Sequence, residues 1–169
     1  MLVYPKEGEL HLLLNKRSDT VEDHKGEVSF PGGRMDEGDG SLLDTALREA
    51  HEEVGVRPED VRVLRRLDDV NTSTGYLVTP FLGAIREGYP FVVSTVEVAE
   101  LVEVPVAALV DGSTTRDETR FEDGVPVSRP NYAHGGHLIW GATARIVTGL
   151  LELVRADEGG ELLSVGEPV

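Results

Sequence analysis

Three glutamates, Glu49, Glu52 and Glu53, are spaced so that a helix would place them side by side. Carboxylates this close repel one another unless a salt bridge or a cation compensates. Arg48 can pair with Asp44 or Glu52, but it cannot neutralise all three glutamates. Hard oxygen ligands clustered around an open site suit Mg²⁺ or Mn²⁺. The alternative is an acidic helix face that points into water, as charge runs usually do.

The element that must position these glutamates is a helix predicted over residues 42–54. Ser41 is a good N-cap, and Asp44 follows three residues later, close to a capping box. The segment contains no Gly or Pro, and Gly55 suits the position just past the helix end. At about 100° per residue the apolar side chains form one stripe, which predicts the buried face. This stripe consists of Leu43, Ala46, Leu47, Ala50 and Val54.

The residues around the glutamates follow a fixed pattern. Gly32 and Gly33 precede the helix and let the backbone turn tightly and approach a ligand. From Arg48 to Val56 the chain then reads R-E-U-x-E-E-x-G-U, where U is a bulky aliphatic residue, except that Ala50 stands at the first aliphatic position. This pattern resembles the core of the Nudix box, which would span residues 33–56.

The resemblance departs from the common box at its upstream acid. Gly40 occupies the position of the usual glutamate, and Asp39 lies one residue earlier, with five residues between it and Gly33. The loop before the helix is therefore one residue longer than the common form. The role of Asp39 stays open at this point.

The Nudix resemblance implies hydrolysis of a diphosphate linked to a nucleoside. Mg²⁺ or Mn²⁺ would be held by Glu49, Glu52 and Glu53, together with Gly33. The ions would neutralise phosphate oxygens and lower the pKa of a water that attacks one phosphorus in line. Arg48 would orient the glutamates. The general base would be one of the box glutamates or Glu97. The alternative interpretation of Glu97 is that it has no catalytic role and is a solvated residue at the start of a strand.

A narrower resemblance points to the coenzyme A pyrophosphatase branch of this family. It is carried by residues 13–18 with 24–33, 41–49, 74–81 and 139–144. It implies that coenzyme A is cut to 3′,5′-ADP and 4′-phosphopantetheine. Several residues would then contact the substrate: the cations for its phosphates, the glycines by close backbone approach and the tyrosine by stacking. These residues are Lys16, Arg17, Lys25, Gly32, Gly33, Arg34 and Tyr76. The alternative for the cationic residues is ordinary surface charge, and the alternative for Tyr76 is a structural role in packing.

Composition limits the class of protein. The chain has 169 residues, which predicts one domain over residues 1–169. A net charge of −15, from 16 basic and 31 acidic residues, argues against nucleic acid or an anionic membrane as partner. There are no cysteines, and no apolar run approaches the ~20 residues of a membrane span. We expect a cytoplasmic protein, monomeric or homodimeric, that acts on a small molecule.

The remaining elements indicate a layered α/β or α+β domain, and the family resemblance implies the Nudix α/β/α sandwich around a mixed β-sheet. Strands are predicted at residues 1–4, 10–14, 61–67, 76–85, 91–93 and 96–104. A short helix should follow Pro105, a hairpin should join 120–121 to 125–128, and a helix should cover 142–154. Two other functions remain: Nudix hydrolysis of ADP-ribose, a dinucleotide or a nucleoside triphosphate, and a non-catalytic Nudix-fold binding module.

Overall fold

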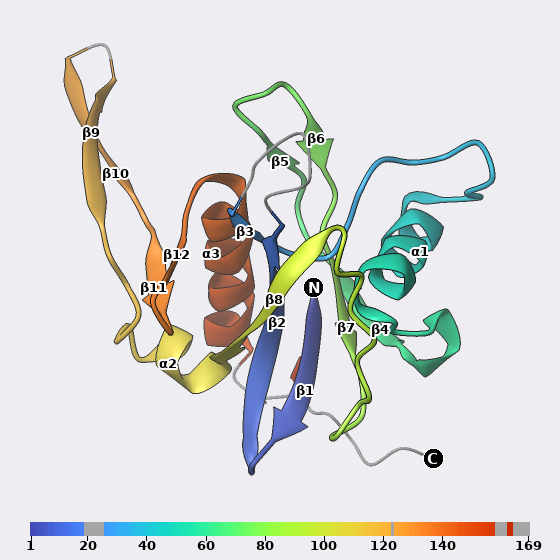
Figure 1. The fold of residues 1–169 in the computed structure, drawn as a ribbon. Helices are drawn as coiled ribbons and strands as arrows, with labels where there is room; N and C mark the ends of the chain where they lie inside the picture. Colours follow the sequence, from blue (N-terminus) through green and yellow to red (C-terminus); the bar gives the residue numbers. More distant parts are fainter. Residues whose placement is uncertain (19–25, 123, 158–161, 164–169) are drawn as a thin grey trace.

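A mixed β-sheet forms the centre of the molecule (Figure 1). The computed structural model describes residues 1–18, 26–122, 124–157 and 162–163. The sheet has the order β3-β2-β1-β7-β4, and β8 pairs with β2. Its strands are β1 (Leu2–Lys6), β2 (Glu9–Arg17), β3 (Val28–Ser29), β4 (Arg62–Arg66), β7 (Phe81–Ala84) and β8 (Val98–Pro105). Only the β1–β7 pair of this sheet is parallel, so the sheet is mixed as predicted.

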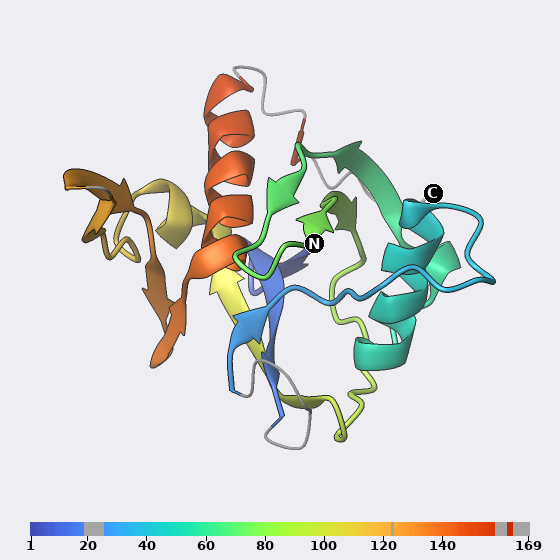
Figure 2. The same ribbon diagram turned by 90° about the horizontal axis from the view of Figure 1, so that it is seen from above.

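Helices cover both faces of this sheet (Figure 2). One face packs against α1 (Leu42–Val54), which is followed by the short 3₁₀ helix η1 (Pro58–Asp60). The other face packs against α2 (Val106–Val110) and α3 (Gly141–Ala156). Each face has its own apolar core, because the side chains of a strand alternate between the two faces. On β2, Leu12 and Leu14 face α3, whereas Leu13 faces α1. The three-layer sandwich expected from the sequence is confirmed.

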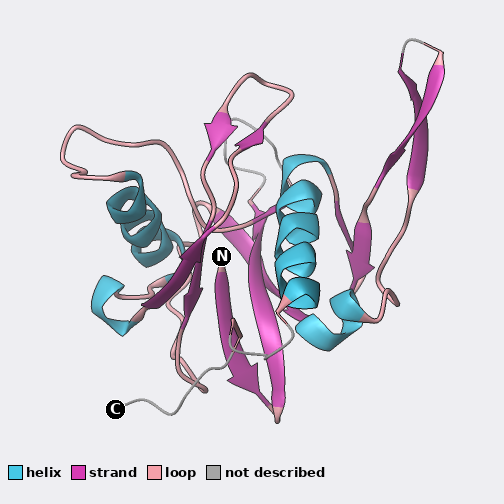
Figure 3. Ribbon diagram, turned by 180° about the vertical axis from the view of Figure 1, so that it is seen from behind, coloured by secondary structure: helices cyan, strands magenta, loops and turns pink. Residues whose placement is uncertain are grey.

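Three two-stranded sheets surround this core (Figure 3). They are β5 (Val70–Asn71) with β6 (Leu77–Val78), β9 (Glu118–Glu122) with β10 (Val125–Arg129), and β11 (Tyr132–His134) with β12 (His137–Ile139). The β9–β10 hairpin, which the sequence predicted, projects away from the body of the molecule. In the part of the chain that is described, no helix has the length and apolar character needed to cross a bilayer.

Two strand predictions need correction. Residues 91–93 are not a strand, because their backbone is used elsewhere: the N–H of Val92 donates to the carbonyl of Val54 at 3.1 Å. The predicted strand over 76–85 is two strands, β6 and β7, separated at Thr79 and Pro80. Proline lacks the N–H that a central strand requires, which explains the break. The short helix after Pro105 and the long C-terminal helix are confirmed as α2 and α3.

Candidate active site

Helix α1 begins and ends where its capping residues predict. Ser41 has an extended backbone, with φ of −158°, and its Oγ accepts a hydrogen bond from the N–H of Asp44 at 3.2 Å. Gly55 adopts the left-handed conformation, with φ of 72°, and its N–H donates to the carbonyl of His51 at 2.9 Å. These caps fix where the helix that carries the three glutamates begins and ends.

The three glutamates of α1 differ in environment. The side chain of Glu52 is 51% exposed, and that of Glu49 is 14% exposed. Glu53 is buried against the sheet, with 4% of the residue exposed. The alternative of an acidic helix face that points into water therefore fits Glu52. It does not fit Glu53, because a buried carboxylate requires compensating partners.

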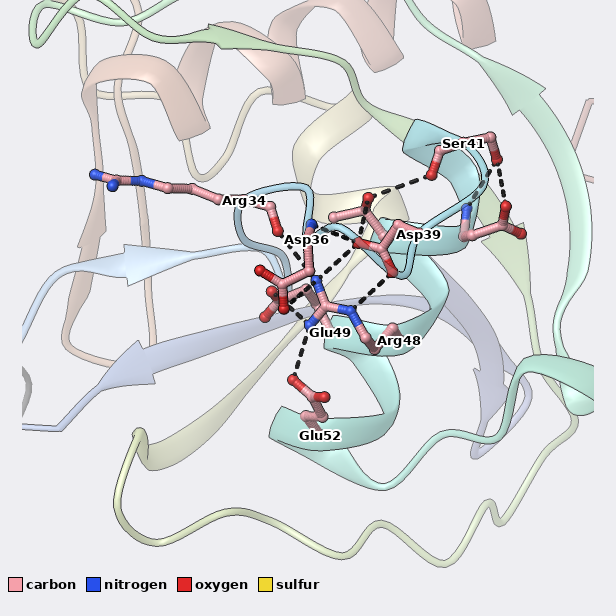
Figure 4. A network of polar contacts seen from close by, with 9 residues as sticks. Arg34, Asp36, Asp39, Ser41, Arg48, Glu49 and Glu52 are labelled. Carbon is pink, nitrogen blue, oxygen red and sulfur yellow. Dashed lines mark hydrogen bonds and ion pairs between the residues drawn. The ribbon is translucent and has the colours of Figure 1, made fainter.

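Arg48 compensates part of this charge by bonding to acids from two segments (Figure 4). Its Nη1 donates to Glu49 Oε1 and to Glu52 Oε2, both at 3.0 Å. Its Nε and Nη2 donate to the two carboxylate oxygens of Asp39, at 3.0 and 3.1 Å. Nη2 also donates to the backbone carbonyl of Arg34 at 3.0 Å. Arg48 thus connects the loop to the helix and orients two of the glutamates.

Asp39 therefore acts in the longer loop as the acidic partner of Arg48. It also accepts from Thr45 Oγ1 and from the N–H of Asp36, each at 2.9 Å. These donors, the Arg48 guanidinium first, hold the pKa of the Asp39 carboxyl well below its usual range. The sequence left this role open because the acid lies one position away from its usual place.

Glu53 has a different set of neighbours. Asn15 Nδ2, on β2, donates to Glu53 Oε2 at 2.6 Å, and the backbone of Gly32 also hydrogen-bonds this carboxylate. Burial, and after it the charges of Glu49 and Glu97, raise the pKa of Glu53 to about 8, against the opposing charge of Arg17. Burial likewise raises the pKa of Glu49 above its ordinary value, with Arg48 acting in the opposite direction.

Glu97 joins this acidic group from another part of the chain. It lies in a turn whose backbone is fixed on two sides: the N–H of Ser94 donates to the carbonyl of Glu53 at 2.9 Å, and the N–H of Ser18 donates to the carbonyl of Glu97 at 2.8 Å. Its charge acts on both Glu49 and Glu53. The structure thus brings Glu97 close to Glu49 and Glu53.

The donor set suits a hard divalent cation. Glu49, Glu52, Glu53 and Glu97 offer only carboxylate oxygens, as Mg²⁺ and Mn²⁺ prefer. A Cβ built on Gly33 would overlap the Glu49 carboxylate, so this glycine leaves room beside the acids. In the described ranges no three Asp, Glu or His side chains are arranged as a metal cluster. The acids are instead turned to protein donors, Glu49 and Glu52 to Arg48 and Glu53 to Asn15.

The predicted substrate-binding residues are only partly brought together. Arg17 lies close enough to Glu53 for its positive charge to lower the pKa of the Glu53 carboxyl. Lys16 follows Asn15 on β2 and by strand alternation lies on the opposite face, with Leu14. Lys25 is outside the described residues.

Arg34 and Tyr76 form a stacked pair that the sequence did not predict as a pair. The Arg34 guanidinium lies 4.7 Å from the centre of the Tyr76 ring and hydrogen-bonds the Tyr76 hydroxyl. The contact connects the loop before α1 to the β5–β6 hairpin. Both side chains lie at the surface, where a planar ligand group can reach them.

Two histidines that follow the β9–β10 hairpin lie outside this site. His134 and His137 line a separate polar cavity of about 180 Å³ beside β8, and none of the box glutamates lines it. His137 Nε2 is 3.3 Å from Glu100 Oε1. Tyr132, another residue of this region, is buried and hydrogen-bonds Thr148.

Comparison with known proteins gives consistent matches. The NUDIX domain model matches residues 1–121. A Photorhabdus laumondii protein named uncharacterized Nudix hydrolase NudL is 40% identical over 144 residues, which cover 85% of this chain and 77% of the relative. A Yersinia pestis protein of the same name is 38% identical over 143 residues, covering 85% and 72%.

Solved structures agree on the fold. The M. smegmatis Nudix hydrolase RenU has a TM-score of 0.61 at 21% identity, covering 92% of this chain and 83% of that one. A binary complex of the C. elegans Ap4A hydrolase has a TM-score of 0.55 at 16% identity, covering 65% and 80%. At these identities the likeness concerns the fold alone.

Proposed function

The chain belongs to the Nudix hydrolase family, and we propose that it is a metal-dependent diphosphatase that cleaves coenzyme A or its derivatives to 3′,5′-ADP and 4′-phosphopantetheine. The reaction class is supported by the acidic group of Glu49, Glu52, Glu53 and Glu97 around the space at Gly33. A single domain over residues 1–169 carries the whole site in this proposal.

The substrate is supported by where the coenzyme A-like segments lie. The end of β2, β3, the β5–β6 hairpin and the first turns of α3 lie toward the same end of the molecule in Figure 1. Arg145 of α3 hydrogen-bonds the carbonyl of Asn71 in β5, and Arg34 contacts Tyr76 next to β6. Segments distant in sequence therefore border one region beside the box.

The acids of this site would hold Mg²⁺ or Mn²⁺. A divalent cation bound there supplies positive charge against the diphosphate oxygens and makes a water molecule more acidic. The protein does the rest: Arg48 fixes the orientation of Glu49 and Glu52, and Gly33 keeps the space beside Glu49 open. Glu97 or a box glutamate accepts the proton of the attacking water.

Cationic and aromatic residues would recognise the rest of the substrate. Because the chain carries a net charge of −15, an anionic substrate needs local positive charge to approach. Arg17 supplies it near Glu53, Arg34 supplies it where its guanidinium lies over the Tyr76 ring, and Tyr76 offers a ring for stacking. Lys16 and Lys25 remain predictions for the outer phosphate.

A substrate panel tests this proposal. Purified protein with Mg²⁺ or Mn²⁺ is incubated separately with coenzyme A, ADP-ribose, NADH and a nucleoside triphosphate, and products are identified by chromatography and mass. We expect preferential release of 3′,5′-ADP from coenzyme A. The Glu52→Gln variant serves as the matched control, because it removes one carboxylate from an exposed position without altering the core.

The other outcomes separate the alternatives. Preference for ADP-ribose, a dinucleotide or a triphosphate contradicts the coenzyme A assignment and leaves the diphosphatase chemistry in place. No cleavage of any of the four, with metal present, contradicts the diphosphatase proposal on these substrates and favours a binding module. The presence of all three box glutamates argues against that module.

A further inference from the structure

Asn15 is a buried polar residue that directly follows three leucines on β2. It follows Leu12, Leu13 and Leu14 on β2, and it is 2% exposed. Its backbone is paired on both sides, with Ser29 of β3 and with Leu101 of β8. The backbone pairing of the strand therefore does not depend on the Asn15 side chain.

The Asn15 amide has one hydrogen bond and one unsatisfied atom. Nδ2 donates to Glu53 Oε2 at 2.6 Å, whereas Oδ1 is buried and has no hydrogen-bond partner among the described residues. An unpaired buried amide oxygen typically costs about 1–3 kcal/mol. The contact with Glu53 is the feature of this side chain that offsets such a cost.

A neutral donor has a specific advantage at this place. Glu53 is surrounded by the charges of Glu49 and Glu97, and Arg48 bonds to Glu49 and Glu52 instead. A cationic donor in place of Asn15 would neutralise Glu53 and compete with a divalent cation. An amide fixes the orientation of the carboxyl group and adds no positive charge that would compete with the cation.

We infer that Asn15 is a positioning residue, which holds the Glu53 carboxylate in place for a divalent cation. The inference rests on the proposed function, because it gives Glu53 the role of a metal ligand. Asn15 itself touches neither substrate nor reacting atoms in this scheme. It belongs to the shell of hydrogen-bonding groups behind the ligands, whose loss typically lowers metal affinity or activity about 10- to 100-fold.

The test replaces Asn15 by residues that cannot donate. Asn15→Leu keeps the branching and the number of heavy atoms of the side chain, and Asn15→Val is smaller than leucine and suited to a strand, so that one variant is available if the other does not fold. Mn²⁺ binding is measured directly by calorimetry, without substrate. We expect the Kd for Mn²⁺ to rise about 10- to 100-fold, and kcat to fall while the substrate KM stays within about threefold.

Leu13→Val is the matched control. Leu13 lies two residues earlier on the same strand, faces the same helix and is fully buried, but it makes no hydrogen bond with Glu53. This variant should lower Tm because it removes buried apolar volume, and it should keep the Mn²⁺ affinity of the wild type within about twofold. The Asn15 variants should show the opposite pattern, with Tm near that of the wild type.

Each outcome decides between distinct conclusions. If folded Asn15→Leu or Asn15→Val binds Mn²⁺ as tightly as the wild type, the positioning role is overturned and the proposed function is untouched. If the wild type itself binds no Mn²⁺, the metal-dependent function and the role of Asn15 both fail. A loss of Mn²⁺ affinity equal to that of Leu13→Val also overturns the inference, because general loosening of the strand would then explain it.

Discussion

Replacing Glu53 by glutamine should stabilise the metal-free protein at neutral and alkaline pH. Burial, and then the charges of Glu49 and Glu97, raise the pKa of Glu53 to about 8. A carboxyl whose pKa is higher in the folded state favours folding when protonated. The contribution of Glu53 to the free energy of unfolding is fully present below the pKa that this carboxyl has in the unfolded chain, and it is lost as pH rises toward 8. A glutamine side chain is uncharged at every pH, so it resembles the protonated form of Glu53 throughout.

The size of the effect follows from the two pKa values. The ordinary value is 4.5 and the folded value is about 8, and each pH unit between them is worth about 1.4 kcal/mol. Between pH 5 and pH 8, the wild type should therefore lose on the order of 3 kcal/mol relative to Glu53→Gln. For a domain of this size that corresponds to roughly 10 °C in Tm.

The assay records Tm for both proteins from pH 5 to pH 8.5 in the presence of a chelator. The Tm difference should be small at pH 5 and should grow as pH rises, in favour of the variant. Glu52→Gln is the control, because its side chain is half exposed and its Tm should follow that of the wild type. Parallel curves for wild type and Glu53→Gln would refute the argument from burial. Mn²⁺ added at pH 8 should restore stability to the wild type and much less to Glu53→Gln.

Three further predictions concern the neighbouring residues. Glu52→Gln should lose most of kcat with Tm near that of the wild type, and full activity in a steady-state assay would contradict its assignment as a metal ligand. Asp39→Asn should lower Tm, because Arg48 loses a charged partner that it contacts with two nitrogens; an unchanged melting curve would rule this out. Gly33→Ala should fold but bind Mn²⁺ more weakly, because the added methyl group displaces the flexible Glu49 carboxylate; calorimetry equal to wild type would show that the space is not needed.

Helix α1 could be predicted to the residue because its signals are local. Ser41 and Gly55 act on the backbone within one turn of themselves, so neighbouring sequence is enough to place both ends. The strand predicted over 91–93 failed for the opposite reason. The N–H of Val92 bonds to the last residue of α1, and no local pattern reveals a partner nearly forty positions earlier. The two-residue strand β3 was missed because it is too short to show alternation.

The candidate site was predictable in composition but not in arrangement. The sequence identified Glu49, Glu52 and Glu53 as one group, yet their burial differs widely because the sheet covers only one side of the helix. The role of Asn15 depends on a contact between β2 and α1, and that of Asp39 on how the longer loop folds back onto Arg48. An asparagine directly after three consecutive leucines is the one signal in the sequence that could have pointed to the role of Asn15.

The glycine that ends α1 has a consequence for attempts to transplant the box. A Cβ on Gly55 would come within 2.8 Å of Val92, so the helix end and the segment leading to Glu97 fit together only through the absence of a side chain. Further along that segment, the N–H of Ser94 donates a hydrogen bond to the backbone carbonyl of Glu53. The 24-residue box therefore does not contain all the residues that hold its glutamates in place. A graft onto another scaffold would need the segment around residues 92–97 as well, or the acidic group would arrive incomplete.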